Sequence, residues 1–355
     1  MPNQVEQVEQ LLTHSKHERD EVNKVSKTLF YIACEKGQIE NVKLLLNDSR
    51  VDTNQTETKF GWTPFHIACW KGHIDIVTLL LNDERVDIDK AENSGGAVPF
   101  HFACAKGHTK IVELLLNDQR VDVNKTINDG ATPLYIACQN GHIETVKLLL
   151  NDKRVDINKV RNTGSSPFWI ACGKGYIEIV KYMLESGKEI DIKKIDNDGV
   201  TPFFLGCYLG QFEIVKLLLN DNRVDINKAN NDGYTPFWIA CYKGHVEIVK
   251  LLLNDQRVDI NKSNNNRVTP FYVACYYGHV EIVKLLLSDD RVEINKANNN
   301  GATPFYVACQ EGHIEIVKLL LNDNSNRTCK SNKLVDFVTT YSIQSFFFSE
   351  KTTNR

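Results

Sequence analysis

The sequence predicts an all-α solenoid built from about nine repeats of paired helices. The first observation behind this prediction is the spacing of cysteine: nine of the ten follow one another at intervals of 34 or 35 residues, namely Cys34, Cys69, Cys104, Cys138, Cys172, Cys207, Cys241, Cys275 and Cys309. The second is proline, which recurs with the same period, eight of nine times directly after threonine, serine or valine. Self-similarity at such a period is the signature of a repeat architecture.

Each repeat begins with the residues of a short first helix, as in 236–243. The Thr235 hydroxyl can accept a hydrogen bond from a free amide of the first turn, and Pro236 has no amide to lose there. We expect the helix to end at Gly244, because glycine readily adopts the left-handed conformation that terminates a helix.

A second helix is expected at residues 246–253, which are apolar apart from Glu247 and Lys250. Such a helix must be covered by neighbours on more than one side. An extended segment follows, in which Val258 and Ile260 alternate with polar residues, and it ends in a turn rich in Asn, Asp and Gly. That composition is typical of the tip of a hairpin.

These residues resemble the ankyrin repeat. The family pattern G-x-T-P-L-H-x-A-A-x-x-G-H, followed by an I-V-x-x-L-L helix and a D-V-N strand, is matched by residues 61–69, 72–73, 76–77, 79–81 and 87–89. The resemblance covers residues 22–322 and implies helix-turn-helix units with short β-hairpin or loop fingers. We therefore expect an N-terminal capping half-repeat (1–27), the repeat array (28–322) and a C-terminal tail that is partly helical or disordered (323–355).

Two departures from the family pattern lead to local predictions. Asn-Asp-x-Arg replaces the glycine that usually ends the second helix, and Asn is the next-best residue for a left-handed cap, so we expect Asn to take that conformation. Arg267 stands where the other fingers have glycine, and we expect Asn265 or Asn266 to take the positive φ in its place.

No residue pattern indicates catalysis, a cofactor or a metal. Six repeats contain Cys-x-x-x-His, as in Cys69 and His73, but zinc needs four converging ligands and the cysteine occupies a position where the family packs alanine between helices. Disulfides between repeats are not expected either, because adjacent helices lie about 8–10 Å apart. Cys329 is the one candidate for an exposed thiol. We expect a protein that is not an enzyme.

Charge and hydropathy exclude several partners. The formal net charge is −3 and no long basic run occurs, so neither nucleic acid nor an anionic membrane surface is expected to bind. No apolar stretch approaches the ~20 residues that cross a bilayer, and residues 1–20 lack the apolar segment of a secretory signal. A cytoplasmic or nuclear monomer is the expectation.

Variable residues inside the constant repeat frame are the candidates for partner binding. By resemblance, the two positions after Ala-Cys face the concave groove and the position before Thr-Pro lies on the fingers beside it. The candidates are Trp62, Trp70, Tyr208, Tyr234, Tyr242, Lys243, Tyr276, Tyr277 and Gln310. Aromatic side chains also follow Pro-Phe, as in Trp238, and these either pack between repeats or contact a partner.

The predicted function is that of a non-catalytic scaffold or adaptor that binds a protein partner through the concave groove and the fingers. One alternative is a recognition fragment of a larger multidomain enzyme or channel. Another is metal or redox sensing by the column of cysteines.

Overall fold

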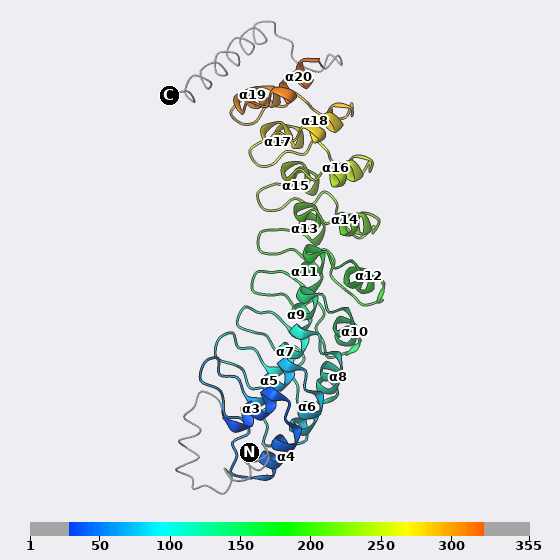
Figure 1. The fold of residues 1–355 in the computed structure, drawn as a ribbon. Coiled ribbons are helices and arrows are strands. Elements are labelled where there is room, and N and C mark those ends of the chain that lie inside the picture. Colours follow the sequence, from blue (N-terminus) through cyan, green and yellow to red (C-terminus); the bar gives the residue numbers. More distant parts are fainter. Residues whose placement is uncertain (1–27, 323–355) are drawn as a thin grey trace, which may run out of the picture. The chain divides into compact units, whose positions relative to one another are not determined.

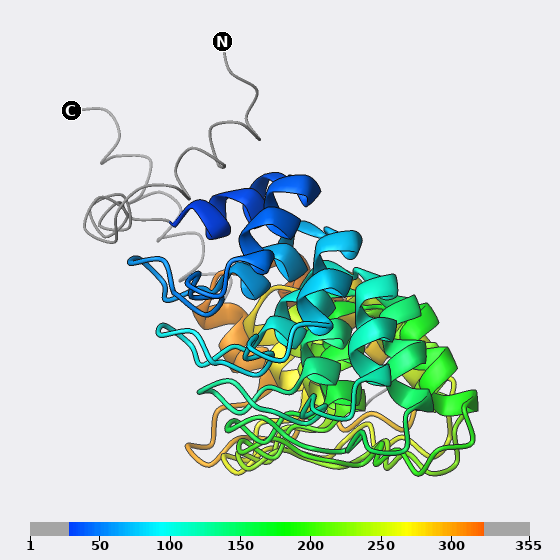
Figure 2. The ribbon, with the colours of Figure 1, turned by 90° about the horizontal axis from the view of Figure 1, so that it is seen from below.

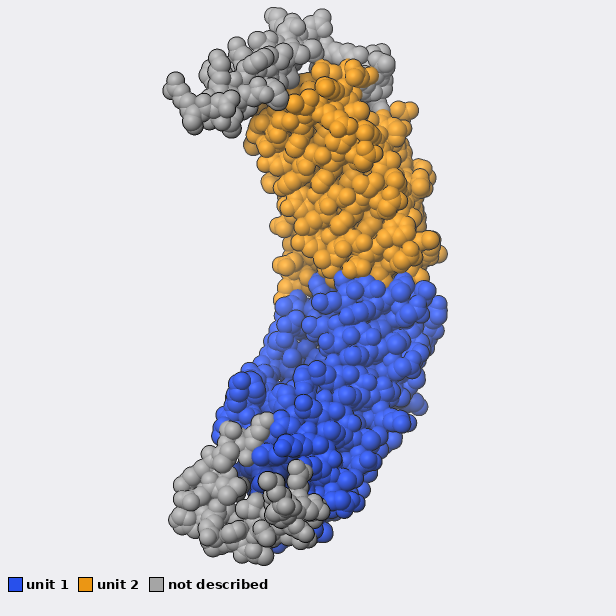
Figure 3. All heavy atoms as spheres, viewed as in Figure 1, with its two compact units in different colours: residues 1–191 blue, residues 192–355 orange. Residues whose placement is uncertain are grey.

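The computed structural model describes residues 28–322, so the expected capping half-repeat, the C-terminal tail and Cys329 lie outside the described residues. The chain divides into two compact units, Met1–Asp191 and Ile192–Arg355, hereafter unit 1 and unit 2 (Figure 3). Residues 28–322 form 18 helices in nine pairs and no β-strand, as the prediction of an all-α repeat fold requires.

Within residues 28–322, five helix pairs belong to unit 1 and four to unit 2; their order along the chain is shown in Figure 1. Those of unit 1 are α3 (Leu29–Lys36), α4 (Ile39–Asn47), α5 (Pro64–Lys71), α6 (Ile74–Leu81), α7 (Pro99–Lys106), α8 (Thr109–Asn117), α9 (Pro133–Asn140), α10 (Ile143–Asn151), α11 (Pro167–Lys174) and α12 (Ile177–Glu185). Those of unit 2 are α13 (Pro202–Leu209), α14 (Phe212–Leu219), α15 (Pro236–Lys243), α16 (Val246–Leu253), α17 (Pro270–Tyr276), α18 (Val280–Leu287), α19 (Pro304–Gln310) and α20 (Ile314–Asn322).

Within each unit the helices form two layers. Each odd-numbered helix packs on the next odd-numbered helix, and each even-numbered helix packs on the next even-numbered one. The loops between successive repeats, here called fingers, project from the odd-numbered layer (Figure 1), and Figure 2 shows those of unit 1 projecting beyond the helices. The core lies between the layers, where Phe237 and Cys241 of α15 and Val249 of α16 are buried.

Most first helices begin and end where the sequence predicts, although α17 and α19 end one residue earlier, at Tyr276 and Gln310. The Thr235 hydroxyl accepts a hydrogen bond from the Trp238 amide at 3.1 Å, and Gly244 closes α15 at φ 77°. Only α7, among the described first helices, starts without a threonine or serine cap: there the His101 ring nitrogen Nδ1 accepts from the amide of Val98 at 3.0 Å.

The fingers are loops closed by tight turns. In the finger before α15, the Asn230 amide donates to the Tyr234 carbonyl and the Gly233 amide donates to the Asn230 carbonyl, both at 3.0 Å. In the extended segment after α16, Val258 and Ile260 are buried while Asp259 is exposed, which confirms the predicted alternation.

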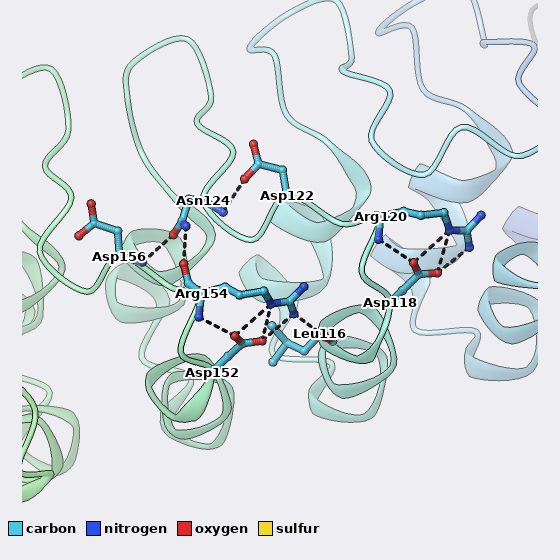
Figure 4. A network of polar contacts seen from close by, with 8 residues as sticks. All are labelled: Leu116, Asp118, Arg120, Asp122, Asn124, Asp152, Arg154 and Asp156. Carbon is cyan, nitrogen blue, oxygen red and sulfur yellow. Dashed lines mark hydrogen bonds and ion pairs between the residues drawn. The ribbon is translucent and has the colours of Figure 1, made fainter.

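The prediction that Asn would end the second helices in a left-handed conformation is wrong. Asn254 is right-handed, and Arg267 is the one non-glycine residue with positive φ among the described residues. The reason lies in the Asp-x-Arg sequence that follows (Figure 4). Arg154 is held by the Asp152 carboxylate, with Nη2 to Oδ2 at 2.6 Å, and donates to the carbonyl of Leu116 in the preceding repeat. An arginine therefore satisfies a free carbonyl at the helix end, and no left-handed residue is needed.

The prediction for the finger that contains Arg267 is also wrong, because Arg267 itself takes the positive φ, at 60°. The Asn264 side chain accepts hydrogen bonds from the amides of Asn266 at 3.0 Å and Val268 at 2.9 Å. These bonds keep the turn in the shape of the other fingers, so the left-handed position falls on the residue that replaces glycine. A left-handed non-glycine residue costs about 1–2 kcal/mol.

Candidate functional site

One face of α15 carries a column of aromatic rings. Tyr234, Trp238 and Tyr242 are four residues apart, so they lie on the same side of the helix and the finger that leads into it. The rings of Tyr234 and Trp238 stack with centroids 4.2 Å apart, and those of Trp238 and Tyr242 stack at 5.5 Å. The column is therefore continuous from the finger to the end of α15.

The end of α17 extends this column into the next repeat. Tyr277 lies edge-on to Tyr242 with ring centroids 4.8 Å apart, and Tyr276 lies 4.9 Å from Tyr277. Tyr277 is 48% exposed and Tyr276 is 37% exposed. The structure thus brings together four of the predicted residues, Tyr234, Tyr242, Tyr276 and Tyr277.

Lys243 connects the column to α13. Its ammonium group lies 4.4 Å from the centroid of the Tyr208 ring and 5.1 Å from that of Tyr242, which are cation–π distances. Tyr208 is itself 38% exposed. These residues, Tyr208, Tyr234, Trp238, Tyr242, Lys243, Tyr276 and Tyr277, are hereafter the tyrosine surface of unit 2.

The sequence allows Trp238 either to pack between repeats or to contact a partner, and the structure shows that it packs between repeats. It is 5% exposed, and its indole Nε1 donates to the carbonyl of Val268 in the next repeat at 2.9 Å. Most side chains at this position are buried between repeats in the same way: His66, His101, Tyr135, Phe204, Trp238 and Tyr272. Its four-residue spacing from Tyr234 and Tyr242 is the signal that could have placed it in the column.

Histidines of the following repeats hold the backbone under the exposed tyrosines. The Nε2 atoms of His245, His279 and His313 lie 3.1, 2.9 and 2.9 Å from the carbonyl oxygens of Tyr208, Tyr242 and Tyr276, respectively. A carbonyl only accepts, so each imidazole donates from Nε2. The histidine of the Cys-x-x-x-His sequence therefore joins repeats, which is a structural role.

The cysteine column consists of buried thiols. Burial raises the pKa of Cys241 and of the other fully buried cysteines well above the ordinary value, and it raises the pKa of Cys309, which is half-buried, to about 11. Such thiols stay protonated at neutral pH and are poor nucleophiles and poor metal ligands. Within residues 28–322, no group of three or more His, Cys, Asp or Glu side chains is arranged to hold a metal ion.

Unit 1 contains a second aromatic cluster, formed by Trp62, Trp70 and Phe102. The rings of Trp62 and Trp70 are 5.6 Å apart, and Phe102 lies 4.6 Å from Trp62 and 5.6 Å from Trp70. The ammonium group of Lys106 lies 3.7 Å from the Trp70 ring centroid. The sequence did not single out Phe102 or Lys106. Phe102 occupies a position that carries leucine, isoleucine or valine in the other repeats, so it looked like an ordinary core residue.

Gln310 is the one predicted site residue that stands apart. It is exposed at the end of α19, and its amide donates to Glu311 at 3.2 Å. No ring or hydrogen-bond contact links it to the tyrosine surface within the described residues.

Among the described residues, no helix is both long and apolar enough to cross a membrane.

Comparison with known proteins agrees with the fold. A search of curated proteins found no match. A family model described as ankyrin repeats (3 copies) matches seven overlapping segments, residues 2–93, 84–161, 100–194, 153–230, 189–264, 209–298 and 256–333. Since these segments cover most of the sequence, the chain belongs to the ankyrin repeat family.

Proposed function

We propose that this protein is a non-catalytic scaffold that binds a protein partner through the tyrosine surface of unit 2. Ankyrin repeats are in general protein–protein interaction modules. The observation that carries the proposal is the group of partly exposed rings of Tyr208, Tyr242, Tyr276 and Tyr277, which lie on three successive repeats. Large side chains with an apolar body and a polar tip are typical anchors of protein interfaces.

The surface is ordered before any partner arrives. Trp238 is the buried member of the column and is hydrogen-bonded to the next repeat, and ring contacts join Tyr242 to Trp238 and Tyr277. His279 holds the carbonyl of Tyr242. Binding would therefore immobilise few additional rotamers, and less of the interface energy is lost in ordering side chains.

The chemistry of the repeats supports binding in preference to catalysis. The recurring thiols are protonated because burial raises their pKa, which makes them poor nucleophiles. The recurring imidazoles use Nε2 in hydrogen bonds between repeats.

Site-specific photocrosslinking tests this proposal. A photoreactive phenylalanine analogue in place of Tyr276 should crosslink a defined protein from a cell extract. The same analogue in place of Lys250, an exposed residue of α16 that pairs with Glu247 at 2.7 Å, should not. Equal recovery of the same proteins at both positions, or none at Tyr276, would contradict the proposal.

A further inference from the structure

Four of the five described first helices of unit 1 end in a lysine. These are Lys36 in α3, Lys71 in α5, Lys106 in α7 and Lys174 in α11, and all four are exposed. Because they occupy equivalent positions in a stack of helices, they form a row along the odd-numbered layer of unit 1, here called the lysine row. Asn140 ends α9 at the one interruption.

The lysines of the row have no carboxylate partner among residues 28–322. The second helices of the same unit show the opposite arrangement. Lys43, Lys147 and Lys181 each pair with a glutamate three residues earlier, at 2.8, 2.8 and 3.5 Å. Of the four lysines in the described even-numbered helices of unit 1, three are thus paired with a carboxylate, while Lys110 of α8 and the lysines of the row are not.

The fold does not require lysine at these positions. A cation at a helix C-terminus interacts favourably with the helix dipole, but Asn140 and, in unit 2, Leu209 end equivalent helices that have the same glycine cap. The glycine terminates the helix whichever residue precedes it. In a chain with a formal net charge of −3, four exposed cations in one row without a carboxylate partner among residues 28–322 indicate a role in binding.

The aromatic cluster of unit 1 lies within the row. Trp70 directly precedes Lys71 and lies under the ammonium group of Lys106, and it contacts Trp62 and Phe102. Trp70 is half-buried, so part of its ring surface is open. The row therefore combines fixed positive charge with an apolar contact point.

The spacing of the row selects the conformation of a ligand. Neighbouring packed helices are about 8–10 Å apart, so lysines of successive repeats recur at about that distance. A polyproline II segment has three residues per turn and rises 3.1 Å per residue, so every third side chain lies on one face at intervals of about 9 Å. In this conformation, carboxylates at every third position would meet lysines of successive repeats. In a β-strand, side chains alternate between the two faces, so carboxylates at every third position would not all lie on one side.

We propose that the lysine row of unit 1 binds an acidic segment of a partner protein in polyproline II conformation, with a carboxylate at about every third residue and an apolar side chain against Trp70. This site is separate from the tyrosine surface and does not depend on it. Charge complementarity identifies the occupant: Lys36, Lys71 and Lys106 recur at intervals of one repeat, Lys174 follows two repeats later, and none has a carboxylate partner among residues 28–322, so regularly spaced carboxylates match them.

The test uses the full chain and a fluorescent peptide with glutamate at every third position and proline elsewhere. Fluorescence anisotropy at about 0.15 M salt, where the screening length is about 8 Å, measures binding. Replacement of Lys71, Lys106 and Lys174 by glutamine should weaken binding about tenfold or more. Replacement of Lys43, Lys147 and Lys181 by glutamine changes the net charge equally and should change affinity by less than about twofold. Circular dichroism establishes that both triple variants fold.

Further comparisons distinguish spaced binding at the lysine row from non-specific charge attraction and from binding at the tyrosine surface. A peptide of the same composition with its glutamates in one block should bind more weakly, and Tyr242→Ala combined with Tyr276→Ala should leave peptide binding unchanged. The proposal is overturned if the spaced peptide does not bind at about 1 mM, if both lysine triples weaken it equally, or if the block peptide binds as tightly. Tighter binding of a single-stranded oligonucleotide of equal charge, lost in the Lys71/Lys106/Lys174 triple variant, would instead assign the row to nucleic acid.

Discussion

The imidazole Nε2 of His279 lies 2.9 Å from the carbonyl oxygen of Tyr242, so a residue of one repeat holds the helix end that presents a tyrosine of the repeat before it. The same ring lies over Gly244, where an added Cβ would stand 2.8 Å from His279 Cε1. Gly244 is thus required for its left-handed φ of 77° and for this close approach of the histidine.

His279→Ala should loosen the end of α15. The substitution leaves the Tyr242 carbonyl without its donor, and the loss of such a hydrogen bond typically costs about 1–2 kcal/mol. Hydrogen exchange should become faster in the last turn of α15. His108→Ala is a matched control because His108 holds the carbonyl of Trp70 at 3.0 Å in unit 1. It should accelerate exchange at the end of α5 instead, and equal effects of both substitutions on α15 would contradict the assignment.

Arg154→Lys should lower the free energy of unfolding by roughly 1 kcal/mol. Lysine cannot reproduce the planar fork with which Arg154 contacts Asp152 and the Leu116 carbonyl together. Urea unfolding followed by circular dichroism measures the change. Lys153→Ala, at the exposed neighbouring residue, should have little effect. If both substitutions shift the midpoint equally, the arginine contact does not stabilise the helix end.

Stability should fall between pH 7 and pH 5 because of two buried histidines. Burial lowers the pKa of His66 and of His101 to about 4, whereas the ordinary value is about 6.5. As the pH falls, His66 and His101 are therefore protonated in the unfolded chain at a higher pH than in the folded chain. The stabilisation is complete above about pH 6.5 and is lost as the pH falls towards 4, by about 2 kcal/mol per histidine at pH 5.

Replacing both histidines by tyrosine, the residue found at the equivalent buried position Tyr135, should flatten this dependence. Urea midpoints at pH 7 and pH 5 provide the measurement. An unchanged difference between the two midpoints in the double variant would show that other groups cause the loss of stability.

The cysteines of the repeats should react slowly with a thiol reagent in the native state. The eight buried thiols have raised pKa values and no access to solvent, while Cys309 is half-buried. We expect at most two thiols, Cys309 and Cys329, to react with 5,5′-dithiobis(2-nitrobenzoate) before denaturant is added. Rapid reaction of three or more would contradict the burial of the column.

The beginnings and ends of the first helices could be predicted because their causes are local. A threonine before proline and a glycine eight residues after the proline specify both caps within one repeat, as at Thr235 and Gly244. The ends of the second helices could not be predicted. The donor that replaces a left-handed cap at Leu116 is Arg154, which lies 38 residues away in the sequence.

In the candidate site, too, features within one repeat could be predicted from the sequence and contacts between repeats could not. The four-residue spacing of Tyr234, Trp238 and Tyr242 lies within one repeat and can be seen in the sequence. The contacts of Tyr242 with Tyr277, and of Trp70 with Phe102, join neighbouring repeats and depend on how those repeats pack. Gln310 is a candidate only because of its position in the repeat, and the structure places it at the exposed end of α19, without a hydrogen bond to the tyrosine surface.

The most direct test of the proposed function is the affinity of the partner captured at Tyr276 for the double variant Tyr242→Ala/Tyr276→Ala. Truncation of an interface anchor typically costs about 2 kcal/mol or more, so we predict at least about a thirtyfold increase in Kd by titration calorimetry. The helical circular dichroism signal should be unchanged, and Lys250→Ala should bind as the wild type does. Wild-type affinity in the tyrosine variant, together with loss of binding in Lys250→Ala, would place the partner on the second helices and contradict the tyrosine surface as its binding site.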